Sequence, residues 1–333
     1  MLTAAPIALS LGDPAGIGPE IIVAAWRALR ETGLVFAVIG DAACLAAVAG
    51  GDVRPIDKVA DANAIFDHAL PVIDLSLAAP ATSGRPSPAA AGRIIEWIEV
   101  AARLALTGEA CAMVTAPIAK APLYEAGFKF PGHTEFLGAL APGRDARARG
   151  PIMMLAGGDL RVSLVTIHEP LARVPGLLSV HAIVNAGLVT AHALRRDFGI
   201  ERPRLAVTGL NPHAGESGAI GREEVDIIAP AIAALRDLGV AVSGPHPADS
   251  LFHADARRTF DAALCMYHDQ ALIPVKMLDF WGGVNITLGL PIVRTSPDHG
   301  AGFDIAGKGV ARADSLIAAL RMAADIAAHR AAG

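Results

Sequence analysis

The chain reads Tyr267-His268-Asp269-Gln270-Ala271-Leu272-Ile273-Pro274-Val275-Lys276 directly after the apolar run 262–266. That run has the length and composition of a buried strand. In α/β proteins, ligands bind in crevices at the carboxyl ends of strands. A histidine, a carboxylate, an amide and a lysine delivered at such a place indicate a site of chemistry, for which the rest of the chain is the scaffold.

Two more histidines follow predicted strands. His168 comes directly after the apolar run 162–167, and His213 comes shortly after the run 205–208. Three imidazoles with one open position form a familiar catalytic zinc arrangement, which other borderline metals also accept. Each histidine has a carboxylate near it in sequence that could orient its ring: Glu169, Glu216 and Asp269. The spacings, 45 residues (168 to 213) and 55 residues (213 to 268), match no short metal motif, so polar residues satisfied within turns are the competing interpretation.

Cationic residues inside apolar stretches predict an anion-binding site. Lys276 and Arg294 both lie in such stretches, where a charge needs a partner. Lysine and arginine commonly bind phosphate and carboxylate, and Asn285 lies between them in sequence. His133-Thr134 would begin a helix whose free N–H groups favour an anion, although an ordinary N-cap also explains Thr134.

Proton transfer could fall to any of four residues, and the sequence does not rank them because a pKa depends on neighbours that are not visible in it. They are Asp249, Asp269, Lys276 and Asp304.

Composition limits the class of protein. The 333 residues are 53% hydrophobic and 18% charged, which suits two domains or one large α/β unit and gives no sign of disorder. The net charge is −5 with no long basic run, so we expect no nucleic-acid partner. No apolar run approaches the ~18 residues of a membrane span, and the first residues do not resemble a signal peptide. Three scattered cysteines read as buried thiols, which indicates a cytoplasmic protein.

Strand-like and helix-like segments alternate along the chain, which predicts an α/β fold with a largely parallel sheet. The Gly-rich segment 12–20 lies between a strand and a helix but lacks both G-x-G-x-x-G and G-K-[ST], so taken alone it is a structural loop. Helices are predicted over 19–30, 42–48, 88–107, 178–198, 223–238 and 314–330, and a loop over 244–250.

Several of these segments together resemble the 4-hydroxythreonine-4-phosphate dehydrogenase family of vitamin B6 biosynthesis. The resemblance spans nearly the whole chain, in the same order, at 12–20, 132–135, 211–216, 267–270, 284–291 and 294–300. Two segments, 16–20 and the loop from His299-Gly300 to Asp304-Ile305-Ala306-Gly307-Lys308, also resemble the wider isocitrate/isopropylmalate dehydrogenase superfamily, in which this loop holds the nicotinamide cofactor.

The resemblance implies an isopropylmalate dehydrogenase-like two-domain α/β/α fold. A discontinuous first domain on the cofactor side would comprise 1–115 and 276–333, and a second domain for metal, substrate and dimerisation would comprise 116–275. It further implies a homodimer whose active site, in the interdomain cleft, is completed by the second subunit.

The same resemblance assigns the site residues. The metal (zinc, magnesium or cobalt) would be held by His168, His213 and His268. The substrate would be bound by His133, Thr134, Lys276, Asn285 and Arg294. NAD or NADP would be bound by Thr295, His299, Gly300 and Asp304. Lys276 and Asp269 are the candidates for catalysis. Ala301-Gly302 departs from the Thr-Ala expected in many relatives, which could alter cofactor contacts.

The implied reaction is the oxidation of 4-phosphooxy-L-threonine with decarboxylation to 3-amino-2-oxopropyl phosphate, in pyridoxal phosphate biosynthesis. Two alternatives stay open. Some members of the family oxidise 4-phospho-threonate, 4-phospho-erythronate or an aromatic cis-dihydrodiol with the same machinery. A non-catalytic sensor of metal or phosphate on this scaffold is the remoter alternative.

Overall fold

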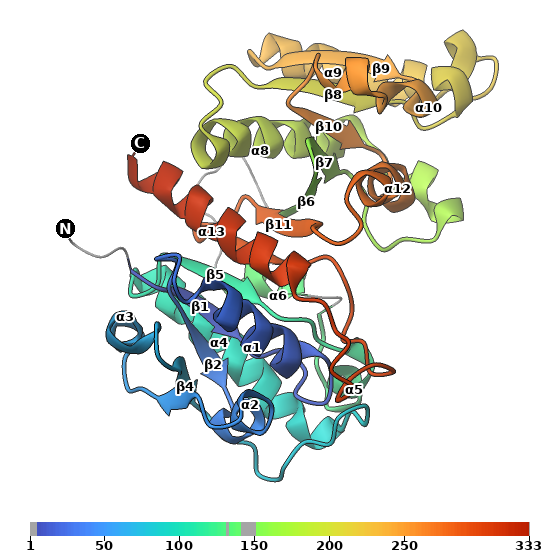
Figure 1. The fold of residues 1–333 in the computed structure, drawn as a ribbon. Coiled ribbons are helices and arrows are strands. Elements are labelled where there is room, and N and C mark those ends of the chain that lie inside the picture. Colours follow the sequence, from blue (N-terminus) through green and yellow to red (C-terminus); the bar gives the residue numbers. More distant parts are fainter. Residues whose placement is uncertain (1–4, 131–132, 141–150, 333) are drawn as a thin grey trace. The chain divides into compact units, whose positions relative to one another are not determined.

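A computed structural model describes residues 5–130, 133–140 and 151–332 of the chain (Figure 1). The chain forms two compact units, each with its own internal packing. Unit 1 comprises Met1–Pro142 with Leu290–Ala328, and unit 2 comprises Gly143–Gly289 with His329–Gly333. The domain bounds expected from the sequence, 1–115 with 276–333 and 116–275, differ from these units and stay a prediction.

Unit 1 is built on a fully parallel sheet in the order β3-β4-β2-β1-β5-β12. The inner strands β1, β2 and β5 are mostly apolar and fully buried because helices cover both faces of a parallel sheet. The strands are β1 (Ile7–Ser10), β2 (Phe36–Gly40), β3 (Val53–Pro55), β4 (Leu70–Asp74), β5 (Ala112–Thr115) and β12 (Arg294–Pro297). The helices are α1 (Gly18–Leu29), α2 (Ala42–Ala49), α3 (Ala62–Ile65), α4 (Ala91–Thr107), α5 (Lys120–Glu125), α6 (His133–Leu140) and α13 (Asp314–Ala332), the last of which ends in unit 2.

Unit 2 has a mixed sheet in the order β11-β6-β7-β10-β8-β9. The pairs β11–β6 and β6–β7 are antiparallel, whereas β7, β10, β8 and β9 pair in parallel. The strands are β6 (Ile152–Gly157), β7 (Leu160–Leu164), β8 (Arg204–Thr208), β9 (Ala241–His246), β10 (Ala262–Cys265) and β11 (Val284–Leu288). The helices are α7 (Val174–Leu177), α8 (Val180–Phe198), α9 (Ala229–Asp237), α10 (Ala248–Leu251), α11 (Ala254–Arg257) and α12 (His268–Leu278).

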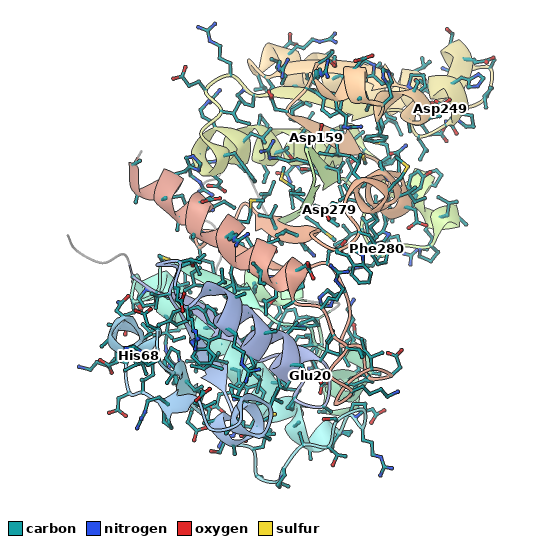
Figure 2. All side chains as sticks on the ribbon, in the orientation of Figure 1. Glu20, His68, Asp159, Asp249, Asp279 and Phe280 are labelled. Atoms are coloured by element: carbon teal, nitrogen blue, oxygen red, sulfur yellow. The ribbon has the colours of Figure 1, made fainter. Side chains whose placement is uncertain are left out.

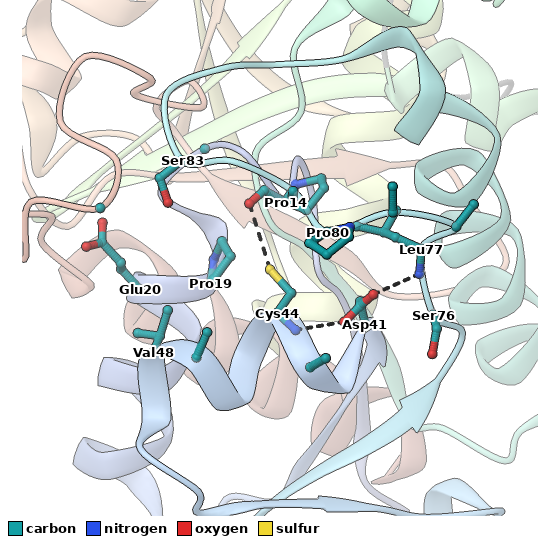
Figure 3. Close-up of a pocket in the computed structure, with 17 residues that line it drawn as sticks. Pro14, Pro19, Glu20, Asp41, Cys44, Val48, Ser76, Leu77, Pro80 and Ser83 are labelled. Atoms are coloured by element: carbon teal, nitrogen blue, oxygen red, sulfur yellow. Dashed lines mark hydrogen bonds between the residues drawn. The ribbon is translucent and has the colours of Figure 1, made fainter.

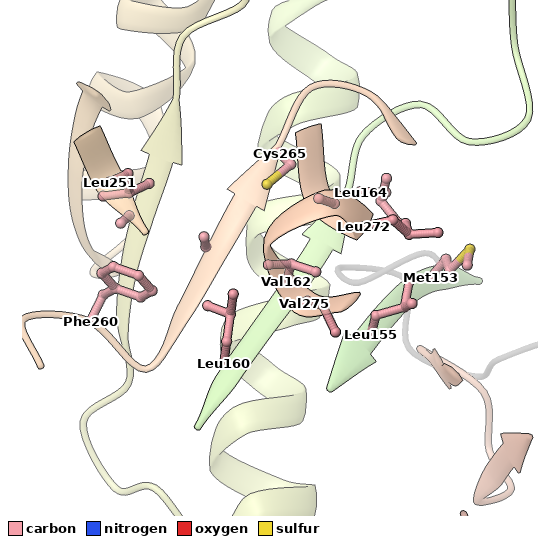
Figure 4. Close-up of a cluster of buried hydrophobic side chains, with 13 residues drawn as sticks. Met153, Leu155, Leu160, Val162, Leu164, Leu251, Phe260, Cys265, Leu272 and Val275 are labelled. Carbon is pink, nitrogen blue, oxygen red and sulfur yellow. The ribbon is translucent and has the colours of Figure 1, made fainter. Parts of the chain in front are cut away.

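Strand β10 lies inside the sheet of unit 2 and is covered on both faces. Ala263 and Cys265 point into the apolar cluster under α12, which Figure 4 shows with Leu272 and Val275 of that helix. Leu264 belongs to a second cluster, with residues of α8 and α9. The alternation of side chains along a strand thus explains why an uninterrupted apolar run was needed here. The strand ends at Cys265, and α12 begins three residues later at His268.

Most predicted elements are confirmed within a few residues. The strand predicted over 162–167 ends earlier, at Leu164, although the N–H groups of Val165 and Thr166 still donate to the carbonyls of Cys265 and Met266. The helix predicted over 88–107 begins with a short 3₁₀ turn, Pro88–Ala90, where the Ser87 hydroxyl accepts from the N–H of Ala89.

The loop predicted over 244–250 is wrong. Residues up to His246 belong to β9, which lies at the edge of the sheet, and Ala248–Leu251 forms α10. Pro245 is tolerated because an edge strand does not need every N–H for pairing, and the register against β8 shifts between Ala206 and Thr208.

The helix predicted over 223–238 exists but opens with a wide turn, Glu224–Ile228, of the π type before α9. Pro230 lacks the N–H that a regular helix would use at this point, which accounts for the irregular start.

All three cysteines are free thiols; Cys265 is buried, as predicted, whereas Cys44 and Cys111 are only partly buried. Within the described ranges, no single helix has the length and apolarity to cross a membrane. Only the bent pair formed by 171–177 and 180–198 meets that test jointly, with an angle of 93° between its parts.

Candidate functional site

The segments that carry His168 and His268 are held side by side. The Thr166 hydroxyl donates to the carbonyl of Met266 at 2.6 Å, and the Val165 N–H donates to that of Cys265. The two histidine rings lie with their centroids 5.7 Å apart. Both rings line one pocket of about 230 Å³, together with Glu169, Tyr267 and Asp269 among others. The structure therefore brings together two of the three histidines that were predicted to converge.

Two of the three histidines contact a carboxylate through the same ring nitrogen. His268 Nδ1 lies 2.7 Å from Asp269 Oδ1, and His213 Nδ1 lies 2.7 Å from Glu216 Oε1. The hydrogen bond with Glu216 raises the pKa of His213 above its ordinary value. A carboxylate at Nδ1 fixes the ring and directs Nε2 outward, which is the arrangement of a metal-ligating histidine. Glu169 instead forms an ion pair with Arg173, at 3.4 Å.

His213 stands on an unusual piece of backbone. Residues 213–217 all have positive φ, between 42° and 77°, and form one left-handed turn. Only Gly215 among them is a glycine, and each residue with a Cβ costs about 1–2 kcal/mol in this conformation. Strain of this kind persists only where the surroundings impose it, and it concentrates at functional sites. The side chain of His213 is 66% exposed, so the backbone of the turn determines where the ring points.

The three histidines do not meet within one chain. Within residues 5–130, 133–140 and 151–332, no three His, Cys, Asp or Glu side chains are grouped closely enough to hold a metal ion. The structure thus brings His168 and His268 together and leaves His213 apart from the pocket that they line.

The predicted substrate residues are partly placed. Arg294, at the start of β12, is 2% exposed, and its Nη2 donates to the Thr115 hydroxyl at 2.7 Å. Lys276 lies two turns along α12 from His268, with Nζ 5.3 Å from the centroid of the Phe280 ring. Asn285 Oδ1 is buried and has no hydrogen-bond partner among the described residues. His133 and Thr134 begin α6 as predicted, but their side chains lie outside the described part of the structure.

The predicted cofactor loop packs against the Gly-rich segment after β1. The Ile17 N–H donates to the carbonyl of Ala301 at 2.8 Å, and the Gly309 N–H donates to Glu20 Oε1. His299, Gly300 and Asp304 are exposed along this loop. Gly302 has φ +55°, so glycine suits this position where many relatives were expected to carry alanine.

Thr295 differs from the other residues predicted to bind the cofactor. It is fully buried, and its hydroxyl donates to the carbonyl of Ala319 in α13. Its side chain is therefore engaged inside unit 1.

A cavity of about 320 Å³ lies at the carboxyl ends of β2 and β4, between α2 and the loop that follows β4 (Figure 3). Asp41 shapes it, because its carboxylate accepts from the N–H groups of Cys44 and Leu77. Burial, with the nearby charge of Asp41, raises the pKa of Cys44 to about 12, so the thiol is not reactive. Gly307 of the predicted cofactor loop also lines the cavity. The mostly apolar lining, with the carboxylates of Glu20 and Asp41, disfavours an anion such as phosphate.

Two buried polar residues that hold the segments of His213 and His268 in unit 2 were not predicted as site residues from the sequence. Gln270 Oε1 accepts from the Met266 N–H, and Gln270 Nε2 donates to the carbonyl of Gly209. Glu224, 3% exposed, accepts from the N–H groups of Leu210 and Asn211. Gln270 lies within the stretch 267–276, two residues after His268. This position was the signal from which its role could have been predicted. Nothing in the adjacent pair Glu223-Glu224 indicates which carboxylate is buried.

Known proteins match the chain over nearly its whole length. Residues 34–323 match the family described as "Pyridoxal phosphate biosynthetic protein PdxA". The 4-hydroxythreonine-4-phosphate dehydrogenase of Caulobacter vibrioides is 65% identical over 331 residues, which are 99% of each chain.

Solved structures agree with this match. A crystal structure of 4-hydroxythreonine-4-phosphate dehydrogenase from Klebsiella pneumoniae has a TM-score of 0.86 and 40% identity, covering 97% of this chain and 100% of that one. A terephthalate 1,2-cis-dihydrodiol dehydrogenase from Burkholderia xenovorans has a TM-score of 0.63 and 30% identity, covering 97% and 98%. Isocitrate dehydrogenase from Methylococcus capsulatus, with a TM-score of 0.50 and 12% identity over 98% of this chain and 87% of that one, shares the fold. The predicted fold class is confirmed.

Proposed function

We propose that this chain, which belongs to the pyridoxal phosphate biosynthetic protein PdxA family, oxidises 4-phosphooxy-L-threonine and decarboxylates the product to 3-amino-2-oxopropyl phosphate. The reaction removes a hydride from the carbon of the secondary alcohol and a proton from its oxygen. The β-keto acid formed then loses CO2. A dehydrogenase of this family requires a nicotinamide cofactor, NAD or NADP, to accept the hydride.

One observation supports this activity above the others. His168 and His268 share a pocket, and the ring of His268 is oriented by Asp269. This imidazole donor set fits zinc or cobalt, with His213 as the third ligand, better than magnesium, which prefers oxygen ligands. When bound, such a cation supplies Lewis acidity for alcohol oxidation and for the negative charge that develops as CO2 leaves.

The chain's own residues divide the remaining work. Asp269 holds the His268 ring through Nδ1. Lys276, on the same helix, is the proposed carrier of the proton that leaves the alcohol, with Asp269 as the second candidate. In unit 1, Arg294 would bind an anionic group of the substrate with its planar fork, and Thr115 fixes one of its nitrogens. In unit 2, Asn285 Oδ1 offers a buried acceptor. His133 and Thr134 are further proposed contacts.

The cofactor would lie along the loop that begins at His299. Its residues His299, Gly300 and Asp304 are exposed, and the packing of Ala301 on Ile17 gives the loop a rigid base. A preformed loop of this kind reduces the entropy that cofactor binding must overcome. Thr295 would act here by anchoring β12 to α13.

A homodimer is the proposed assembly. Helix α12 and the residues after it expose four large apolar side chains: Ile273 (66%), Met277 (74%), Phe280 (61%) and Trp281 (52%). Figure 2 labels Phe280 and the adjacent Asp279. An apolar patch of this kind marks an interaction surface. Because it shares a helix with His268 and Lys276, a second subunit seated on it would lie beside the proposed site. Such a partner would also account for the separation of His213 from His168 and His268. Each metal site would then take its three histidines from two chains.

A panel of substrates tests the reaction. Reduction of NAD or NADP is followed by absorbance with 4-phosphooxy-L-threonine, 4-phospho-threonate, 4-phospho-erythronate and an aromatic cis-dihydrodiol, each with added zinc, cobalt or magnesium. We expect turnover of the hydroxythreonine phosphate. Turnover of a sugar acid phosphate or a dihydrodiol without it would replace the proposed substrate. Tight substrate binding with no reduction of either cofactor would favour a non-catalytic sensor.

The metal assignment has its own test. In His213→Ala we expect activity and bound metal, measured by elemental analysis, to fall together, because a ligand is lost. His246→Ala is the control: His246 contacts Ser243 and its loss should leave both unchanged. Full metal content in His213→Ala would remove this residue from the proposed site.

A further inference from the structure

The left-handed turn 213–217 requires something to hold it, and one buried carboxylate occupies its inner side. Glu224 is the first residue of the π turn before α9 and is 3% exposed. Its Oε1 accepts from the N–H groups of Leu210 and Asn211, both at 2.7 Å, and its Oε2 accepts from Asn211 Nδ2 at 2.9 Å. Three donors from the segment that enters the turn thus converge on one side chain.

The glycines of the segment make room for this carboxylate. A Cβ at Gly215 would lie 2.5 Å from Glu224 Oε2, and a Cβ at Gly209 would lie 3.0 Å from Glu224 Oε1. The backbone therefore closes around the carboxylate at two points, one before the turn and one within it. Any larger residue at 215 would displace either the turn or Glu224.

The ring of His213 has few contacts of its own. It is 66% exposed, and the carboxylate that it hydrogen-bonds, Glu216, belongs to the same turn. Histidine and its orienting carboxylate are therefore carried as one unit on a backbone whose conformation L-residues disfavour. The position of that unit depends on the groups that fix the backbone from outside. Glu224 accepts three hydrogen bonds from the segment that leads into the turn, whereas Glu223 and the carbonyl of His246 accept one each.

We propose that Glu224 is a positioning residue: its buried carboxylate locks the left-handed turn and so holds His213 in place for the divalent cation. The inference rests on the proposed role of His213 as a ligand. Glu224 itself touches neither substrate nor metal. It acts by making the turn rigid before a ligand arrives, which lowers the entropic cost of binding.

The adjacent residue offers a matched control. Of the three donors that converge on Glu224, only Asn211 Nδ2 also donates to Glu223. Its distance to Glu223 Oε2 is 2.7 Å. Glu223→Gln and Glu224→Gln make the same chemical change one residue apart, and each keeps one acceptor oxygen and gains an NH2 group. Glutamine at 223 can keep the single bond to Asn211 by turning its amide, whereas glutamine at 224 cannot accept from three donors on two atoms, so its buried NH2 group must face one of them. Arg330→Met is a second control, since it weakens unit 2 at a place away from the turn.

Two measurements on the full-length protein test the proposal. The first is the Kd for Co²⁺ and for Zn²⁺, with the Co²⁺ absorption spectrum as a report on ligand geometry. For Glu224→Gln we expect affinity to fall about 10- to 100-fold, the usual effect of losing a group that orients a ligand, with a changed spectrum. Gly215→Ala, which presses on the carboxylate from the other side, should act in the same direction. Glu223→Gln and Arg330→Met should stay within about twofold of the unaltered protein.

The second measurement is amide hydrogen exchange over 209–217, which needs no metal. Exchange at Leu210 and Asn211 should rise at least about tenfold in Glu224→Gln and remain unchanged in both controls. The proposal is overturned if Glu224→Gln lowers the melting temperature yet leaves exchange in this segment and metal affinity unaltered. If the unaltered protein binds neither cation, the proposed function fails, and the exchange result still decides whether Glu224 holds the turn.

Discussion

Gln270 Oε1 lies 2.7 Å from the hydroxyl of Thr208, so the first turn of α12 is tied to the end of β8. The same amide accepts from the Met266 N–H and donates to the carbonyl of Gly209. One buried side chain therefore satisfies polar groups at the ends of β8 and β10. These are the two neighbouring strands that precede His213 and His268 in the sequence. Replacing Gln270 should therefore lower the free energy of unfolding, because Gln270 supports the site and is not itself a proposed catalytic residue.

Gln270→Leu should destabilise the protein by about 3 kcal/mol, because leucine has a similar size but leaves the Met266 N–H and the Gly209 carbonyl without partners in the interior. The Thr208 hydroxyl would keep only its longer contact, 3.3 Å, with the carbonyl of Leu264. Urea unfolding measures the loss. Thr208→Val is the milder comparison and should cost about 1 kcal/mol, since the amide keeps its two backbone contacts. A loss below that of Thr208→Val would mean that water replaces the glutamine.

Arg330→Met should destabilise unit 2 by about 2 kcal/mol. Asp197, 1% exposed, accepts hydrogen bonds from Arg330 at 2.8 and 3.0 Å and from Arg196 at 2.6 and 3.1 Å. Without Arg330 the buried carboxylate keeps only one partner. Arg222→Met removes an exposed pair with Asp226 and should change stability by less than about 0.5 kcal/mol. Equal effects of the two variants would contradict the importance of burial here.

The stability that this pair contributes should depend on pH. Burial favours a higher pKa for Asp197, but hydrogen bonds from Arg330 and Arg196 outweigh it and lower the pKa below its ordinary value of 3.8. A depressed pKa means that the contribution is complete above the ordinary value and is lost as the pH falls through the folded-state pKa. The difference in unfolding free energy between the unaltered protein and Arg330→Met should therefore be constant near neutral pH and shrink in acid.

The sequence was sufficient for the parts of the fold that follow from apolar runs. Strand β8 (Arg204–Thr208) contains the whole apolar run 205–208, and α12 begins at His268, where the polar cluster was recognised. Such runs report burial directly, so they place strand ends and the residues that follow them. The pairing of His168 with His268 follows from the adjacency of β7 and β10, which a linear pattern does not reveal.

The left-handed turn could not be predicted, because four of its five residues disfavour that conformation and only Gly215 signals it. What makes the turn possible is a carboxylate from a helix that starts further along the chain. Long-range hydrogen bonds such as those of Glu224 and Gln270 have no local signature. Pro245 led to the wrong prediction of a loop over 244–250 for a related reason. The effect of a proline on a strand depends on whether that strand lies at the edge of the sheet.

Met277→Glu should dissociate the proposed homodimer. Met277 is 74% exposed on α12, and a carboxylate there would be buried in the interface of each subunit. At about 2 kcal/mol per subunit the dimer Kd should rise about 1,000-fold. Light scattering after size-exclusion chromatography measures the mass. Leu238→Glu changes a residue that is 59% exposed outside α12 and should leave the mass unaltered. An unaltered protein that is already monomeric, or a Met277→Glu protein that stays dimeric, would rule out this face.

Arg294→Lys should raise the KM for 4-phosphooxy-L-threonine about 10- to 100-fold, with a smaller change in kcat. Lysine keeps the positive charge but loses the planar fork that can bind two oxygens at once, and its single nitrogen must choose between the Thr115 hydroxyl and the substrate. Thr115→Val leaves the guanidinium in place and removes one of its anchors, so its KM should rise by less, about fivefold. Arg312→Lys, in an exposed pair with Asp314, is the control for the same exchange and should behave as the unaltered enzyme. If Arg294→Lys retains its fold by circular dichroism and also retains the original KM, this arginine does not bind the substrate.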